Sequence, residues 1–449
     1  MTSNRQTVFH IRRSTREFLV SKTDSPAKKG QIDKTERIDR DRIKKEFPNL
    51  DLDRSFTDHA LTALNSSRKF GAMGIQIDNF KAKSESDDED DRTDVWIDVA
   101  KSIDKICREE NGIWGLLTGD LFGSVFSAKN DLFCRKTAKK IQAGLSSLQN
   151  RTVSIGISTY PMLNFDKSQT IANTQKALDH AAFFNGNSIV SLDAVSFNIS
   201  GDKLYQAKDF HGALKEFTIG LMIDPSNVNL HNSLGVCHGV LGSLDKALES
   251  FDAALWLDPD EMMALYNKGL IFMMQENREK ALDLFLQANR SGEDVFEILF
   301  QIGRIYLQMG KSKEGRTFLE KAVKLKPDSG SAFRFLGECC AVDNMIEEAI
   351  NAYTKAVKQN PSDASSLSAL GHFFDIQGEN AEIAVSLCEQ SVRLSPENGL
   401  FRHRLGERYL KLNMVDKALE QFQKAVDLGH DSSAFIEKIN NRDAEDRLK

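Results

Sequence analysis

The sequence lacks several features that identify membrane, secreted and zinc-binding proteins. No apolar run approaches the roughly 18 residues of a membrane-spanning helix, so we expect no transmembrane segment. Four arginines fall within the first 16 residues, but neither an apolar core nor a small-residue cleavage site follows them, which predicts no secretory signal. The six cysteines form no CxxC pair and no zinc-spaced cluster with histidine. We therefore expect buried free thiols in a reducing cytoplasm.

The chain also lacks a strong overall charge. Its formal net charge of −6 over 449 residues gives no general attraction to nucleic acid. Residues 1–50 carry thirteen Lys and Arg against seven Asp and Glu, and aromatic residues do not alternate with the basic ones. We interpret this segment as a basic, flexible leader that binds no nucleic acid. Six of the seven residues at 85–91 are acidic, which predicts a solvated loop.

A 34-residue repeat dominates the second half of the chain. When the sequence from Ala194 is laid out in rows of 34, glycine falls at the eighth position of every row: Gly201, Gly235, Gly269, Gly303, Gly337, Gly371 and Gly406. One extra residue near 379–380 displaces the last row by one. Allowing for it, a small residue follows twelve positions after each glycine, and most rows have a large apolar residue four further on. Proline closes five rows, at Pro225, Pro259, Pro327, Pro361 and Pro396.

This pattern resembles the tetratricopeptide repeat (TPR), in seven copies over residues 194–432. The resemblance implies an all-α solenoid in which each copy is a pair of amphipathic helices. Small residues let paired helices approach closely, and stacking buries an apolar face that a lone copy would expose. Residues 433–449 are interpreted as a C-terminal solvating helix that faces the last repeat with Phe435 and Ile439.

In the TPR family, the first helices of successive repeats line a concave groove. Carried onto this chain, the inward positions predict a peptide-binding groove that contains Asn232, Val236, Tyr266, Leu270, Met273, Met274, Phe300, Arg304 and Arg334. Methionine and aromatic side chains suit adaptable binding of a peptide. The alternative is that Tyr266, Met273 and Met274 pack against neighbouring repeats or the N-terminal domain. The family's arrangement for clamping a free C-terminal carboxylate is absent.

After Arg334 the inward positions become polar, with Glu338, His372, Asp375, His403, Glu407 and Lys411. His372 and His403 have no carboxylate partner that their spacing reveals. We interpret both as polar groups of the groove and not as metal ligands.

Residues 51–193 lack the 34-residue repeat, and their hydrophobic pattern predicts an α/β domain. Apolar runs bounded by turn residues predict strands at 72–77, 153–158 and 188–192 and a hairpin over 114–126. Helical periodicity predicts helices over 96–107, 136–148 and 170–184. The order strand, helix, hairpin, helix, strand, helix, strand predicts a sheet with helices on at least one face.

Motifs within this domain resemble those of the diguanylate cyclase (GGDEF) family. IQIDNFK at 75–81 stands where the family has D-x-D-x-F-K, TGDLF at 118–122 where it has G-G-D/E-E-F, and VSIGI at 153–157 where it has V-S-I-G-V. The order and spacing of these pieces carry the resemblance. It implies a nucleotide-cyclase-type sheet with flanking helices.

Members of that family join two GTP molecules into cyclic di-GMP. The reaction needs magnesium held by carboxylates, because the metal neutralises charge on the phosphoryl oxygens. Gln76 replaces the first aspartate of the strand motif, and Leu121 replaces the glutamate of the hairpin. Ala182 and Gly186 stand where the family has lysine and arginine.

The carboxylates that remain are Asp78, Asp94 and Asp120. Together with Gln76 and Leu121 they form what we interpret as a vestigial nucleotide and metal site without catalytic residues. The chain therefore needs no cofactor, although Asp78 and Asp120 could hold a weakly bound magnesium ion. We expect Leu121 to be exposed at the hairpin tip, where Leu121→Glu would leave the fold intact.

Together these interpretations predict that the protein is a non-enzymatic signalling adaptor of the bacterial cytoplasm. Its inactive GGDEF-like domain would dimerise or dock on a signalling partner, while the TPR groove binds a protein or peptide. One alternative is a receptor for GTP or cyclic di-GMP that regulates the TPR domain. The other is residual diguanylate cyclase activity.

Overall fold

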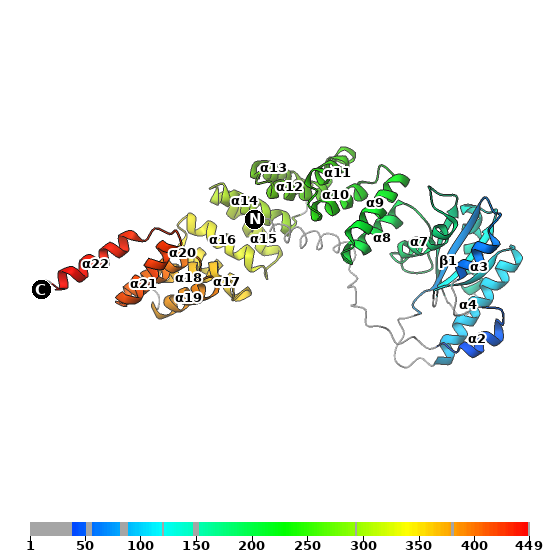
Figure 1. The fold of residues 1–449 in the computed structure, drawn as a ribbon, viewed down its shortest axis with the longest axis horizontal. Helices are drawn as coiled ribbons and strands as arrows, with labels where there is room; N and C mark the ends of the chain where they lie inside the picture. Colours follow the sequence, from blue (N-terminus) through cyan, green and yellow to red (C-terminus); the bar gives the residue numbers. More distant parts are fainter. Residues whose placement is uncertain are drawn as a thin grey trace. The chain divides into compact units, whose positions relative to one another are not determined.

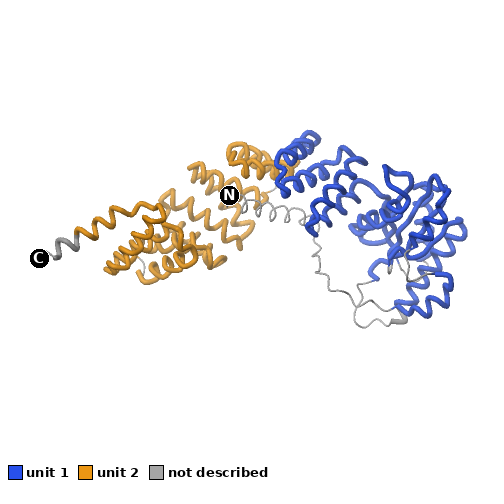
Figure 2. Tube along the Cα trace, viewed as in Figure 1, with its two compact units in different colours: residues 1–259 blue, residues 260–449 orange. Residues whose placement is uncertain are grey.

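The computed structural model describes residues 38–50, 56–80, 89–118, 121–146, 152–291, 294–378 and 381–447. The chain divides into two compact units, residues 1–259 and 260–449, which Figure 2 shows in different colours. Most of the predicted leader and of the acidic run at 85–91 lies outside the described residues. No helix in the described ranges is both long and apolar enough to cross a membrane.

A mixed five-stranded sheet forms within the described part of the first unit (Figure 1). Its strands are β1 (Phe70–Ile77), β2 (Ile113–Thr118), β3 (Leu121–Ser127), β4 (Val153–Tyr160) and β5 (Ile189–Ser191). They lie in the order β2-β3-β1-β4-β5. β1 pairs antiparallel with both β3 and β4, whereas β5 is parallel to β4. Every predicted strand and the predicted hairpin are present, each within a few residues of its expected position.

Helices cover both faces of this sheet. They are α2 (Arg40–Glu46), α3 (Phe56–Ala63), α4 (Glu89–Glu109), α5 (Asp131–Ser146), α6 (Lys167–Ala172) and α7 (Thr174–Ala181). Met73 of β1 joins a core with Trp96 of α4 and Ala138 of α5 on one face. Phe70 joins a second core with Phe56 of α3 on the other face. Successive residues of β1 thus serve opposite cores, as the pleat of a strand requires.

A row of glycines crosses the sheet and sets how closely the helices approach. From β2 to β4, each glycine stands opposite the next: Gly115, Gly123, Gly74 and Gly156. A methyl group built on Gly156 would come within 2.2 Å of the carbonyl oxygen of Thr174 and 2.5 Å of the backbone nitrogen of Leu178. The backbone of α7 therefore packs directly on β4, and no larger residue fits between them.

Seven pairs of helices follow along the described chain, as the repeat predicts. The first unit holds α8 (Ala194–Gln206), α9 (Phe210–Ile223), α10 (Val228–Val240) and α11 (Leu244–Leu257). The second unit begins with α12 (Met262–Met274), α13 (Arg278–Ala288), α14 (Phe296–Gln308), α15 (Ser312–Leu325) and α16 (Gly330–Val342). It continues with α17 (Ile346–Gln359), α18 (Ala364–Gln377), α19 (Ala381–Leu394), α20 (Gly399–Lys411) and α21 (Val415–Asp427).

The glycine at the eighth position of each row has a packing role. A methyl group on Gly235 would lie 2.6 Å from the ring of Phe251, and one on Gly269 would lie 2.7 Å from the ring of Phe285. The glycine thus makes room for the large residue sixteen positions later in the same repeat. The final helix, α22 (Ser433–Arg447), covers the last repeat as predicted, because Phe435 stacks on Phe422 with ring centroids 4.9 Å apart.

The α/β part and the first repeat share one hydrophobic cluster. Its members are Ala177, Leu192 and Phe197, with Met162, Phe165, Ile219 and Ile223 packed around them. Lys176 of α7 adds an ion pair with Glu216 of α9, with 2.7 Å between nitrogen and oxygen. Asp193 caps the first turn of α8 by accepting a hydrogen bond from the backbone of Ser196. Helix α8, the first helix of the repeat region, therefore begins at Ala194, directly after its capping residue.

Candidate functional site

The predicted vestigial site begins at one end of β1 and β3. Phe122 stands opposite Ile75, so Gln76 and Leu121 come to the same end of neighbouring strands. Leu121 is only 5 % exposed and belongs to the same core cluster as Phe56 of α3. The expectation that Leu121 is exposed at the hairpin tip is therefore wrong. The residue already belongs to β3, and strand alternation turns it toward α3.

Asp78 follows directly after β1 and holds a turn in place. Its Oδ1 accepts a hydrogen bond from the hydroxyl of Ser154 at 2.7 Å, and its Oδ2 accepts one from the backbone nitrogen of Asn187 at 2.7 Å. Gly186, with φ of +81°, lies against the same carboxylate: a methyl group there would be 3.1 Å from Oδ2. The carboxylate thus joins Ser154 of β4 to the turn that leads into β5.

The other two carboxylates of the predicted set do not extend this arrangement. Asp94 lies on α4, and its carboxylate forms an ion pair with Arg42 of α2. Asp120 lies outside the described residues, so a weak magnesium site between Asp78 and Asp120 stays a prediction. In the described ranges, no group of three or more His, Cys, Asp or Glu is placed to hold a metal ion.

The cysteines offer no reactive thiol. All six are buried and free, as predicted. Burial is the main cause that raises the pKa of Cys107 and of Cys134 to about 12. A thiol is a good nucleophile only as the thiolate, so these two cysteines are inert at neutral pH.

The first helices of the repeats carry the predicted groove residues. We use the term first-helix face for the surface of the second unit formed by α12, α14, α16, α18 and α20. Within it, α14 lies against α16 and α18 lies against α20. Asn232 and Val236 belong to α10 in the first unit, and both are buried.

The apolar residues of the predicted groove divide into two groups. Tyr266, Leu270 and Phe300 are buried. The ring of Tyr266 lies 5.5 Å from that of Phe285 in the same repeat, which supports the packing alternative for this residue. Met273 and Met274 at the end of α12 are only half-buried. Part of their flexible apolar surface is therefore accessible.

The two arginines of the predicted groove have different surroundings. Arg334 has carboxylate partners: Nη1 lies 3.0 Å from Oε1 of Glu338, and Nε lies 3.5 Å from Oδ2 of Asp363. Arg304 forms no hydrogen bond or ion pair with another described residue, and its Nε is buried. Burial, and then the nearby Arg334 guanidinium, lowers the pKa of Arg304.

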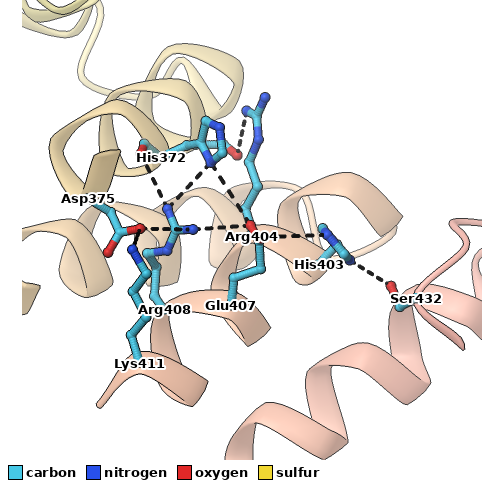
Figure 3. Close-up of polar contacts among 9 residues, drawn as sticks. His372, Asp375, His403, Arg404, Glu407, Arg408, Lys411 and Ser432 are labelled. Atoms are coloured by element: carbon cyan, nitrogen blue, oxygen red, sulfur yellow. Dashed lines mark hydrogen bonds and ion pairs between the residues drawn. The ribbon is translucent and has the colours of Figure 1, made fainter. Parts of the chain in front are cut away.

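A network of charges joins α18 to α20 (Figure 3). Arg408 is buried, and its Nη2 lies 3.1 Å from both Oδ2 of Asp375 and Oε2 of Glu407. Its Nη1 donates to the carbonyl oxygen of His372 at 3.3 Å. Lys411 lies 2.6 Å from the same oxygen of Asp375. Because an unpaired buried charge is costly, the two carboxylates are what make the burial of Arg408 tolerable.

The two histidines lie on either side of Glu407 (Figure 3). His372 Nδ1 is 4.0 Å from one carboxylate oxygen, and His403 Nε2 is 3.9 Å from the other. The other ring nitrogen of His403 shares a hydrogen bond of 2.8 Å with Ser432. Burial, and then the nearby Arg404, lowers the pKa of His372 to about 4, and burial also lowers the pKa of His403. Both imidazoles are therefore neutral at neutral pH.

Sequence reasoning missed the carboxylate beside these histidines. His372 and Glu407 occupy the same position of consecutive rows, 35 residues apart because of the inserted residue. Side chains at equal positions of first helices meet when repeats stack, so the row alignment contained the signal. The interpretation that the spacing of these histidines reveals no carboxylate partner is therefore wrong.

Comparisons with known proteins concern the repeats. The sequence model of the tetratricopeptide repeat matches residues 238–294 and 296–329. No curated protein sequence matches significantly. YrrB, described as a TPR protein with an unusual peptide-binding site, is 22% identical; the match covers 42% of this chain and 96% of that one, with a TM-score of 0.39. PilF of Pseudomonas aeruginosa is 21% identical over 48% of this chain and 97% of its own, with a TM-score of 0.44. The chain therefore contains tetratricopeptide repeats.

Proposed function

We propose that this protein is a non-enzymatic cytoplasmic adaptor whose tetratricopeptide repeats bind a segment of a partner protein. The repeats carry this proposal, because stacked helix pairs within each unit present an extended surface to a partner. The half-buried Met273 and Met274 supply adaptable apolar contact, and Arg304 supplies charge on the same first-helix face.

In this proposal the α/β part is a GGDEF-like domain that performs no nucleotide chemistry. Gln76 supplies no negative charge for a metal ion, and Leu121 is part of the core. Both oxygens of Asp78 are engaged by Ser154 and Asn187. A magnesium ion would have to displace these hydrogen bonds, since it needs oxygen ligands at close range in octahedral geometry.

A turnover assay tests the absence of catalysis. The full-length protein is incubated with GTP and either magnesium or manganese, and cyclic di-GMP is measured by mass spectrometry. We expect none, and measurable turnover would refute the proposal. Calorimetric titration with GTP and with cyclic di-GMP tests the receptor alternative: heat of binding at or below millimolar nucleotide would favour a receptor over an adaptor.

Affinity purification tests the adaptor role itself. Full-length protein and a Met273→Glu, Met274→Glu variant serve as baits, and co-purifying proteins are identified by mass spectrometry. Met222→Glu is the matched control, because Met222 is 61 % exposed on α9 and lies on a second helix. We expect specific partners to be lost with the double variant and kept with the control. Light scattering of the purified protein tests the dimer proposed for the α/β part.

A further inference from the structure

The charged residues of the first-helix face differ in whether the protein already neutralises them. Arg408 is held between Asp375 and Glu407, and Lys411 shares Asp375 (Figure 3). These groups satisfy one another, so a ligand gains little by pairing with them. We therefore interpret the network between α18 and α20 as a contact that stabilises the packing of the last two repeats.

Arg304 differs from those residues. Its side chain is largely buried on α14, yet no carboxylate, hydroxyl or carbonyl among the described residues accepts a hydrogen bond from it. The titratable groups that act on it are Tyr266 of α12 and Arg334 of α16. Three consecutive repeats thus surround a guanidinium that has lost much of its hydration without gaining a partner. Such a group destabilises the free protein and is stabilised by an incoming anion.

We propose that Arg304 binds the side-chain carboxylate of an aspartate or glutamate in an acidic segment of a partner protein. This inference rests on the proposed function and specifies the chemistry of the partner. Guanidinium pairs with carboxylate through parallel hydrogen bonds, and the pair is strong where water is partly excluded.

The charges nearby favour a carboxylate over a phosphate. Arg334 is already paired with Glu338 and Asp363, so of these two described arginines Arg304 is the one that offers a free positive charge. One free positive charge matches the single negative charge of a carboxylate. A phosphorylated residue carries about −1.5 to −2 at neutral pH, so part of its charge would stay unpaired at Arg304.

Peptide selection on the full-length protein tests the inference. A phage-displayed library of random peptides is selected against the wild type, Arg304→Met, Arg304→Lys and Arg393→Met. Arg393 is the matched control, because it is exposed on α19, a second helix. We expect wild-type selection to enrich peptides with an aspartate or glutamate at one fixed position. The best peptide is then synthesised with that acid, with the corresponding amide, and with phosphoserine.

The affinities of these peptides show whether Arg304 pairs with the acidic side chain. We expect Arg304→Met to bind the acidic peptide roughly tenfold or more weakly than the wild type does. The wild type should bind the amide peptide more weakly than the acidic peptide by the same factor. Arg304→Met should bind the amide peptide no more weakly than it binds the acidic peptide, because the interaction is already lost. Arg304→Lys should retain part of the affinity, since it keeps the charge without the fork geometry. Arg393→Met should bind like the wild type.

Thermal unfolding separates binding from support of the fold. We expect Arg304→Met to unfold at the same temperature as the wild type or higher, because methionine replaces an unpaired buried charge. A lower midpoint would overturn the inference in favour of a structural role. Enriched peptides without an acid, affinity indifferent to Arg304→Met, or tighter binding of the phosphoserine peptide would also overturn it while leaving the adaptor proposal intact. No enrichment with any variant would overturn both.

Discussion

Removing the carboxylate of Asp78 tests whether this residue is a structural brace. It accepts hydrogen bonds from Ser154 and Asn187, each at 2.7 Å. A hydrogen bond to a charged group contributes about 1.5–3 kcal/mol, and partial exposure places these two near the lower value. We therefore expect Asp78→Ala to lower the free energy of unfolding of the α/β part by about 3 kcal/mol, and Ser154→Ala, which removes one of the bonds, by about half as much.

Tryptophan fluorescence can follow the α/β part separately. The chain has three tryptophans: Trp96, Trp114 and Trp256. Trp96 is fully buried on α4 and Trp114 lies on β2, whereas Trp256 is 83 % exposed on α11. In a Trp256→Phe background, emission during urea unfolding reports only on the α/β part. This separation matters because a chain with two compact units need not unfold in one step.

Asp58→Ala is the matched control for this experiment. Asp58 is an exposed carboxylate in the first turn of α3, and its loss should change the free energy of unfolding by no more than about 0.5 kcal/mol. If Asp78→Ala unfolds at the same urea concentration as Asp58→Ala, the brace interpretation is refuted. If magnesium stabilises the wild type but not Asp78→Ala, the carboxylate binds the metal instead.

Three further predictions use the same measurements. Leu121→Glu places an unpaired charge in the core and should destabilise the α/β part by about 3–5 kcal/mol; wild-type stability would contradict the burial of this residue. Gly156→Ala should cost about 1–3 kcal/mol, more than Gly74→Ala, because its methyl group would lie 2.2 Å from a backbone oxygen of α7, whereas the nearest atoms to a methyl group on Gly74 belong to the side chain of Thr174, at 3.0 and 3.2 Å. The pKa of His372 is about 4 in the folded protein and 6.5 ordinarily, so the unfolded state takes up the proton first and stability falls as pH drops from 6.5 toward 4. His372→Gln should lose less stability than the wild type over this window, as followed by circular dichroism; an equal loss would show that other groups set the pH dependence.

The repeat region was predictable because its pattern recurs in every row. A single row would fix helix ends poorly, but seven aligned rows place each glycine against the large residue that follows it. Gly235 and Phe251 illustrate this pairing, which the structure shows as direct contact. Asp193 caps the helix that begins at Ala194, the residue from which the rows are counted.

The details of the candidate sites depend on partners that are distant in the sequence. Asp78 was recognised as a strand-end carboxylate, but Ser154 and Asn187 are 76 and 109 residues away, and no local pattern connects them. Leu121 was placed at the tip because the hairpin was expected to project into solvent. Leu121 is instead buried because α3 packs on the sheet, and no hairpin motif encodes that packing. Arg304 was identified as inward-facing, but its lack of a partner appears only when the neighbouring repeats are in place.

The shared cluster around Phe197 gives the α/β part a structural role in the repeat region. A stack of helical repeats has an apolar surface at each end that must be sealed against water. In the second unit α22 covers the last repeat, and in the first unit α7 and the loop bearing Met162 and Phe165 cover the first repeat. Sealing depends on the outer surface of this part and not on the strand ends around Gln76. Substitutions at those strand ends should therefore leave the covering of the first repeat unchanged.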